Sequence, residues 1–180
     1  LDNYMQAVEI DSDYADGYMG SGLIYKSVGN YEQAIANYTR AIELNPDYAD
    51  AYYNRGNVYK SVGNYEQAIA DYTRAINIGV DYPDAYLERG NAYLEQGLYE
   101  EALDNYMQAV EIDSDYADGY YGRALVYQTL GDVEQSLADY TQVIELNSEF
   151  AYAYRGRGFV YYSQGQYEQA LVDFHRYLDL

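Results

Sequence analysis

The sequence repeats itself with a step of 34 residues along its length. The eighteen residues LDNYMQAVEIDSDYADGY occupy 1–18 and recur unchanged at 103–120, three steps further on. Realignment at each step gives five units, 15–48, 49–82, 83–116, 117–150 and 151–180, and residues 1–14 match the second half of a unit. A period of this size is typical of supersecondary modules that stack on their neighbours. A recent duplication and an engineered graft in register both explain the unchanged copy.

Each unit has the residue spacing of two helices joined by a tight turn. In the second unit, Tyr52, Arg55, Gly56 and Tyr59 share one helical face. Gly63 then interrupts the pattern, and glycine tolerates the positive φ that ends a helix. The same spacing resumes at Ala68, Ile69, Tyr72, Ala75 and Ile76. We therefore expect two antiparallel helices in each unit.

Small residues recur where the helices of a unit must approach each other. The counterparts of Gly56 are Gly22, Gly90 and Gly158, and those of Ala68 are Ala34, Ala102 and Ala170. Tyrosines such as Tyr52, Tyr59 and Tyr72 then fill the space around this contact, with their hydroxyls reaching water or a polar partner. Most of the 28 tyrosines are therefore expected to be core residues.

The pattern of aromatic, glycine and alanine positions resembles that of the tetratricopeptide repeat family. It is met in the second unit by Tyr52, Gly56, Tyr59, Ala68, Tyr72 and Ala75. The resemblance extends over all five units and implies an all-α fold, a right-handed α-solenoid of stacked antiparallel helix pairs, with 1–14 as a lone second-type helix. The family's leucine is replaced by Ser21, Arg55, Arg89, Arg123 and Arg157. We expect these arginine stems to cover the core with their charged heads exposed.

The charge of the chain limits the classes of partner. A net charge of −20 and a pI near 4.1 exclude an electrostatic footprint for nucleic acid or an anionic membrane. A neutral to cationic protein or peptide fits better; the alternative is that the acidity only keeps a tyrosine-rich surface in solution. No apolar run approaches the roughly 18 residues that span a bilayer, so a cytoplasmic location is expected.

Catalytic and metal chemistry find little support in the residues. The chain has no cysteine and one histidine, His175, which is expected on the surface of the last helix. The acidic turn at 11–17 resembles a calcium loop, but Ala15 and Gly22 stand where oxygen ligands belong. We therefore expect no enzyme activity, no cofactor and no metal site.

The family resemblance implies that the second, fifth, ninth and twelfth residues of a unit face a concave groove. The predicted groove residues are Tyr53, Asn57, Lys60, Leu87, Asn91, Tyr121, Leu125, Arg155 and Phe159, and Asp50, Asp84 and Asp118 form an acidic edge. Apolar anchors beside asparagine amides suit an extended peptide, and the apolar members have no evident packing duty within the unit. In the alternative interpretation, Leu87, Leu125 and Phe159 contact the neighbouring helix.

The leading functional hypothesis is a non-enzymatic scaffold that binds an extended, neutral to cationic peptide or protein segment in this groove. The alternative is a structural role, in which uncapped ends associate with further copies, or an engineered repeat protein without a peptide ligand. Tyr177 stands where other units have Ala41, Ala75 or Ala109, and its bulk suits an end of the stack.

Overall fold

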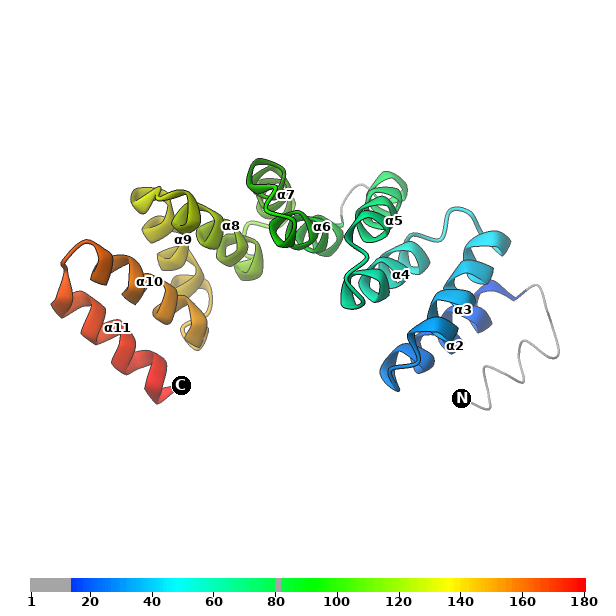
Figure 1. Ribbon diagram of the computed structural model, residues 1–180, viewed down its shortest axis with the longest axis horizontal. Helices are drawn as coiled ribbons and strands as arrows, with labels where there is room; N and C mark the ends of the chain where they lie inside the picture. Colours follow the sequence, from blue (N-terminus) through cyan, green and yellow to red (C-terminus); the bar gives the residue numbers. More distant parts are fainter. Residues whose placement is uncertain (1–13, 80–81) are drawn as a thin grey trace. The chain divides into compact units, whose positions relative to one another are not determined.

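A computed structural model of the protein describes residues 14–79 and 82–180. Within these ranges the chain forms ten α-helices and no strand (Figure 1). The helices are α2 (Ala15–Ser27), α3 (Tyr31–Leu44), α4 (Ala49–Ser61), α5 (Tyr65–Ile78), α6 (Pro83–Glu95), α7 (Tyr99–Ile112), α8 (Ala117–Leu130), α9 (Val133–Leu146), α10 (Ala151–Ser163) and α11 (Tyr167–Asp179). The predicted helix at 1–14 lies outside the described residues, Tyr14 excepted.

A glycine ends the turn between the two helices of each repeat. Gly63 has a φ of 80°, and its counterparts Gly29, Gly97, Gly131 and Gly165 have φ between 73° and 80°. The Asn64 N–H that follows bonds to the Tyr59 carbonyl at 2.8 Å, and the Gly63 N–H bonds to the Lys60 carbonyl at 3.0 Å. These bonds satisfy carbonyls that the end of α4 leaves open. The helix–turn–helix prediction is confirmed.

The chain separates into two compact units, unit 1 up to Ala92 and unit 2 from Tyr93 to Leu180, with the boundary inside α6. In unit 1, α3 packs against both α2 and α4, and α2 also contacts α4. In unit 2, α9 packs against both α8 and α10, and α8 contacts α10. Each unit therefore has one layer of first helices and one layer of second helices.

Tyrosine rings fill the core between the layers. Tyr38, Tyr72, Tyr106 and Tyr140 are the largest fully buried side chains of the described residues. A Cβ added at Gly22 would lie 2.4 Å from the Tyr38 ring, and one at Gly56 would lie 2.8 Å from the Tyr72 ring. The glycines therefore give room to the rings of their own repeat, as the sequence predicts.

The arginine heads are not exposed to solvent, contrary to the sequence-based expectation. Arg55 donates from Nε and Nη2 to the two carboxylate oxygens of Asp71, both at 2.7 Å. The same two-bond pair joins Arg123 to Asp139 at 2.7 Å and Arg157 to Asp173 at 2.8 Å. The expectation was wrong for these three arginines because α5, α9 and α11 each present a carboxylate sixteen residues further on, within reach of the guanidinium.

Two of these arginines also form hydrogen bonds with the preceding repeat. Arg55 Nη1 donates to Thr39 Oγ1 at 3.0 Å, and Arg157 Nη1 donates to Thr141 Oγ1 at 3.1 Å. Each of these two guanidiniums therefore bonds two successive second helices. Burial lowers the pKa of Arg55, but the hydrogen bonds to Asp71 and the attraction of its charge together outweigh burial, so the pKa is raised.

Candidate functional site

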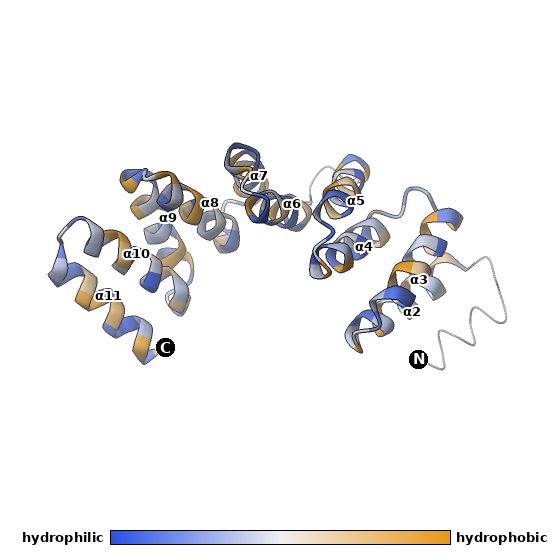
Figure 2. Cartoon of the chain, viewed as in Figure 1, coloured by the Kyte–Doolittle hydropathy of each residue, from blue (hydrophilic) through white to orange (hydrophobic). Residues whose placement is uncertain are grey.

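The predicted groove residues lie on the first helices of the repeats. We call this the first-helix surface: α2, α4 and α6 up to Ala92 in unit 1, and α8 and α10 in unit 2. Figure 2 shows both hydrophobic and hydrophilic residues on these helices. Unit 1 carries Asp50, Tyr53, Asn57, Lys60, Asp84, Leu87 and Asn91, and unit 2 carries Asp118, Tyr121, Leu125, Arg155 and Phe159.

Tyr53 and Tyr121 are packed into ring clusters. The Tyr53 ring centroid lies 6.0 Å from that of Tyr72 and 5.1 Å from that of Tyr82. Tyr121 repeats this arrangement in unit 2, 6.1 Å from Tyr140 and 5.0 Å from Phe150. The expectation that these rings lack a packing duty was wrong, because the aromatic residue that precedes the next first helix folds onto them.

Burial raises the pKa of the Tyr53 hydroxyl, and it likewise raises that of Tyr121. Both side chains are half-buried. Each ring thus offers part of its area to a ligand and holds two successive repeats together with the rest.

Asn57 and Asp50 have partners within the fold. The Asn57 side-chain oxygen accepts a bond of 2.8 Å from the buried Tyr72 hydroxyl. One carboxylate oxygen of Asp50 accepts from the Tyr82 hydroxyl at 3.1 Å, and in the preceding repeat Asp16 accepts from Tyr48 at 2.7 Å. These side chains therefore join helices to each other, and a peptide would have to bind the groups that remain.

Lys60, Asn91 and Glu88 form a polar cluster in unit 1. Lys60 makes an ion pair with Glu88, and the Asn91 amide donates to the same carboxylate at 3.1 Å. Lys26 donates to the Asn54 side chain at 3.5 Å. Burial lowers the pKa of Lys26, and this effect exceeds the opposing attraction of Glu88. Both lysines are therefore engaged with the following repeat.

Leucines and aspartates of the predicted site are divided between the core and the surface. Leu87 is half-buried on α6, and Leu125 packs against a cluster that contains Tyr140 and Val160. For Leu125 the structure therefore favours the alternative interpretation, contact with the neighbouring helix. Asp84 and Asp118 are exposed in the first turns of α6 and α8.

The first-helix surface of α10 is aromatic and exposed. Tyr152, Phe159 and Tyr162 are 53%, 52% and 59% exposed. The Arg155 guanidinium lies between two rings, 5.0 Å from the centroid of Tyr152 and 5.8 Å from that of Tyr177. Tyr177 thus folds back onto α10, and Phe159 meets Phe174 edge-on at 5.1 Å.

Sequence reasoning did not find the acidic partners of the arginines, although a signal was present. The pairs Arg55–Asp71, Arg123–Asp139 and Arg157–Asp173 recur at one spacing, whereas the first repeat has Ser21 and Asn37 at the same two positions. The third repeat combines Arg89 with Asn105, so the spacing predicts the pair only in the three repeats that have both residue types. Asp71, Asp139 and Asp173 are structural residues and are buried.

The sequence analysis also did not identify a second set of glycines that contact tyrosine rings. A Cβ added at Gly122 would lie 2.6 Å from the Tyr106 ring, and one at Gly156 would lie 2.4 Å from the Tyr140 ring. These glycines admit the ring of the preceding repeat, whereas Gly22 and Gly56 admit the ring of their own. The equivalent positions in unit 1 are Gly20, Asn54 and Glu88, so a search for small residues shared by all repeats overlooks them.

Among residues 14–79 and 82–180, no three histidine, aspartate or glutamate side chains come together in a way that suits a metal ion. His175 is exposed on α11. None of the described helices has the length and apolarity to cross a bilayer.

A family model described as TPR repeat matches residues 22–63, 56–97, 90–131 and 129–165. The chain belongs to the tetratricopeptide repeat family. The predicted family is thereby confirmed, and with it the general character of such proteins as protein-interaction scaffolds. No curated protein matches the sequence.

Solved tetratricopeptide repeat structures confirm the predicted fold class, an all-α solenoid of stacked helix pairs. YrrB, described as a TPR protein with an unusual peptide-binding site, is 25% identical, covers 98% of this chain and 91% of its own, and has a TM-score of 0.79. A MamA protein is 24% identical over 92% of this chain and 90% of its own, with a TM-score of 0.82. MamA from Desulfovibrio magneticus RS-1 is 18% identical over 92% and 94%, with a TM-score of 0.83.

Proposed function

We propose that this protein is a non-enzymatic scaffold whose first-helix surface binds an extended peptide or protein segment. The observation that carries the proposal is the exposed aromatic set on α10, Tyr152, Phe159 and Tyr162, beside Arg155. Exposed aromatic side chains that adjoin one arginine have the composition of interface hot spots. They stand at positions that the family resemblance assigns to the groove, and the similarity to YrrB supports a peptide as the ligand.

The proposed partner is neutral to cationic. The net charge of −20 favours the approach of basic segments and repels acidic ones. In unit 1 the two lysines of the first-helix surface, Lys26 and Lys60, face an asparagine and a glutamate of the next repeat. Their charge is thus partly compensated within the fold, and the surrounding carboxylates set the sign of the field.

Phe159→Ala is a sharp test because half of its ring is exposed and, among the described residues, it packs against one ring only, that of Phe174. A library of extended peptides is displayed, the tightest binder is selected, and its Kd is measured by fluorescence polarisation. Phe159→Ala and Tyr162→Ala are each expected to weaken binding by about tenfold or more. Val172→Ala on α11, which removes an exposed apolar side chain of a second helix, is the matched control and should leave Kd unchanged.

Equal affinity of the Phe159→Ala variant and the unaltered protein contradicts the proposal. A version of the selected peptide in which lysines replace its neutral polar residues should bind more tightly, and one with glutamates less tightly, with both differences shrinking in high salt. Tyr53→Ala and Tyr121→Ala are poorer probes, since each removes a ring that packs against two others.

A second candidate, association with another copy, is favoured by the apolar face of α11. Leu171, Val172 and Leu178 are exposed on this helix. Apolar side chains that share one helix and face solvent are candidates for a protein contact. Light scattering over a concentration series tests this candidate, because a mass that stays that of one chain at all concentrations excludes it.

A further inference from the structure

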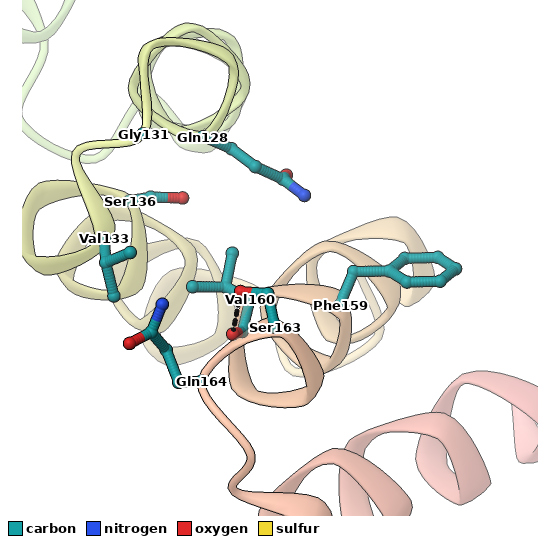
Figure 3. A pocket seen from close by; sticks show the side chains of 8 residues that line it. All are labelled: Gln128, Gly131, Val133, Ser136, Phe159, Val160, Ser163 and Gln164. Carbon is teal, nitrogen blue, oxygen red and sulfur yellow. Dashed lines mark hydrogen bonds between the residues drawn. The ribbon is translucent and has the colours of Figure 1, made fainter.

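A hollow of about 340 Å³ opens between the helices of unit 2 (Figure 3). It lies where the end of α8 and the beginning of α9 face the end of α10. Its lining residues are Gln128, Gly131, Val133, Ser136, Phe159, Val160, Ser163 and Gln164. The volume stands at the lower end of the roughly 300–1,000 Å³ typical of ligand pockets, which suits one side chain.

The hollow coincides with a missing ring. Val133 occupies a position at which the other repeats have tyrosine, namely Tyr31, Tyr65, Tyr99 and Tyr167. In unit 1, Tyr65 is half-buried and packs against a cluster of Ala68, Tyr72 and Ala92, the last of which belongs to the following first helix. Val133 packs against the corresponding cluster in unit 2, which contains Val160. A valine is much smaller than a tyrosine, so space remains on the α10 side.

The lining is mixed in a way that suits a phenol. Val133 and Val160 give apolar walls, while Gln128, Ser136, Ser163 and Gln164 bring polar groups to the same hollow (Figure 3). The Gln128 oxygen accepts from the Tyr140 hydroxyl at 2.6 Å, and this bond fixes the side chain at the edge of the hollow. Ser136 replaces the alanine of the other repeats and donates to the Ala124 carbonyl at 3.2 Å.

Phe159 connects the hollow with the first-helix surface. Phe159 is one of the residues that line the hollow, and it also lines a second, apolar depression of about 310 Å³ formed with Arg155, Phe174, Tyr177 and Leu178. Its ring points away from Val133 and Gln164 (Figure 3), so Phe159 borders the hollow on one side and the exposed surface of α10 on the other. We propose that this hollow receives a tyrosine side chain of the peptide that the first-helix surface binds.

This inference rests on the proposed function and adds to it a sequence requirement for the ligand. The ring of the peptide takes the place that the protein's own tyrosine takes in the other repeats. Its apolar carbons contact Val133 and Val160, and its hydroxyl meets the polar edge. A tyrosine is preferred over a phenylalanine, because a phenyl ring leaves the polar groups at the edge without a new partner.

The test uses p-cresol, the tyrosine side chain as a free molecule, and toluene as the analogue without a hydroxyl. Both are titrated into the full chain while the valine methyl signals are followed by NMR. With p-cresol, saturable shifts are expected at Val133 and Val160, with toluene binding several-fold more weakly. Absence of shifts at these two residues overturns the proposal.

Two variants test the space beside Val133: one fills it, and the other creates the equivalent space in unit 1. Val133→Tyr supplies the residue of the other repeats, so it should keep the helical circular dichroism while weakening p-cresol binding by about tenfold or more. Tyr65→Val makes the reverse change in unit 1 and should create a second site, seen as new shifts of the Ala92 methyl. Unaltered p-cresol binding by a folded Val133→Tyr protein overturns the assignment to this hollow.

Binding experiments with a selected peptide distinguish a failure of this inference from a failure of the proposed function. A selected peptide should lose about tenfold in affinity when its tyrosine becomes alanine, and Val133→Tyr should reproduce that loss. If a selected peptide binds through Phe159 but Val133→Tyr changes neither its Kd nor the p-cresol shifts, the tyrosine hollow is wrong and the scaffold stands. If no peptide binds while p-cresol does, the proposed function fails and this inference fails with it, and the hollow remains only a site for a free phenol.

Discussion

Tyr72 in unit 1 and Tyr140 in unit 2 occupy the same position of the repeat, and both are fully buried. Their hydroxyls nevertheless have different partners. Tyr72 donates to Asn57 at 2.8 Å, whereas Tyr140 donates to Gln128 at 2.6 Å. The position of Asn57 is a leucine in the fourth repeat, so the bond moves one helical turn along α8. The partner of this buried hydroxyl can thus come from more than one position, whereas the equivalent hydroxyl of Tyr38 in the first repeat is buried without a hydrogen-bond partner among the described residues.

The two units also differ in the contacts between successive repeats. In unit 1 the side chains of Asn54 and Glu88 meet the lysines of the preceding repeat. In unit 2 these positions are Gly122 and Gly156, and tyrosine rings approach the bare backbone. In unit 1 polar contacts join successive first helices, whereas in unit 2 rings of the second helices α7 and α9 pack against the glycines of α8 and α10. The aromatic side chains Tyr152, Phe159 and Tyr162 of α10 are exposed. The difference indicates that unit 2 carries the stronger apolar anchors for a ligand.

The largest loss of stability is expected at the arginine–aspartate pairs, which both units contain. Arg55→Ala in unit 1 and Arg123→Ala in unit 2 each leave a buried carboxylate without its cation, and each should lower the free energy of unfolding by about 3 kcal/mol or more. Urea unfolding measures the loss, and hydrogen exchange shows in which unit it falls. The double variants with Asp71→Ala or Asp139→Ala should lose much less than the sum of the single losses. A loss below about 1 kcal/mol in either single variant contradicts a structural role for the pair.

The next effect distinguishes the two ways of joining repeats. Gly156→Ala places a Cβ 2.4 Å from the Tyr140 ring, so it should destabilise the protein by about 1–3 kcal/mol. Glu88→Ala, at the equivalent position of unit 1, introduces no new atom against the ring and should cost about 1 kcal/mol or less. Thermal unfolding measures both. If the two variants are equally stable, close packing does not set unit 2 apart.

Phenylalanine substitutions test the two hydroxyl bonds. Tyr72→Phe and Tyr140→Phe should each cost about 1 kcal/mol, since each leaves one amide oxygen without a donor. Chemical unfolding at neutral pH gives these values. Asn57→Leu combined with Tyr72→Phe removes both polar groups and should restore part of the loss; a further loss of similar size would contradict the assignment of the bond.

Alkaline pH should weaken both units through their buried tyrosines. Burial raises the pKa of Tyr38 to about 12, and burial also raises the pKa of Tyr72 and of Tyr140. The folded protein thus keeps protons that the unfolded chain loses from about pH 10, so stability is fully present below pH 10 and falls as the pH rises towards 12. Unfolding curves between pH 9 and about 12 measure this slope, and Tyr140→Phe should make it shallower. Stability that is constant across this range contradicts the expected linkage.

The smallest effect concerns the ion pair of unit 1. Lys60→Met removes the cation from Glu88 while keeping an apolar stem, and it should change the free energy of unfolding by less than about 1 kcal/mol. The difference from the unaltered protein should shrink in high salt. A large, salt-independent loss shows instead that the pair is as important to unit 1 as the arginine pairs.

The sequence by itself determined the period, the two helices of each repeat, the glycine turns and the tyrosine core. The helices and turns depend on residues a few positions apart, and the small and aromatic positions of the core recur at a period of 34 residues, which makes them visible in the sequence. The close contact at Gly56 was predictable because most repeats have glycine at this position. Gly156 was not, since its counterparts Asn54 and Glu88 fill the same place with polar side chains.

Only the tertiary structure decided where the polar side chains bond. Arg55 reaches Asp71 sixteen residues away, and Tyr82 reaches Asp50 across 32. Such partners depend on which faces of neighbouring helices meet, and helical periodicity alone does not specify that. For the same reason Asn57, predicted to bind a peptide, bonds the hydroxyl of Tyr72, and Tyr53 packs against two rings. A side chain on the outer face of a helix has a binding role only to the extent that the neighbouring repeat leaves its surface and its polar groups unoccupied.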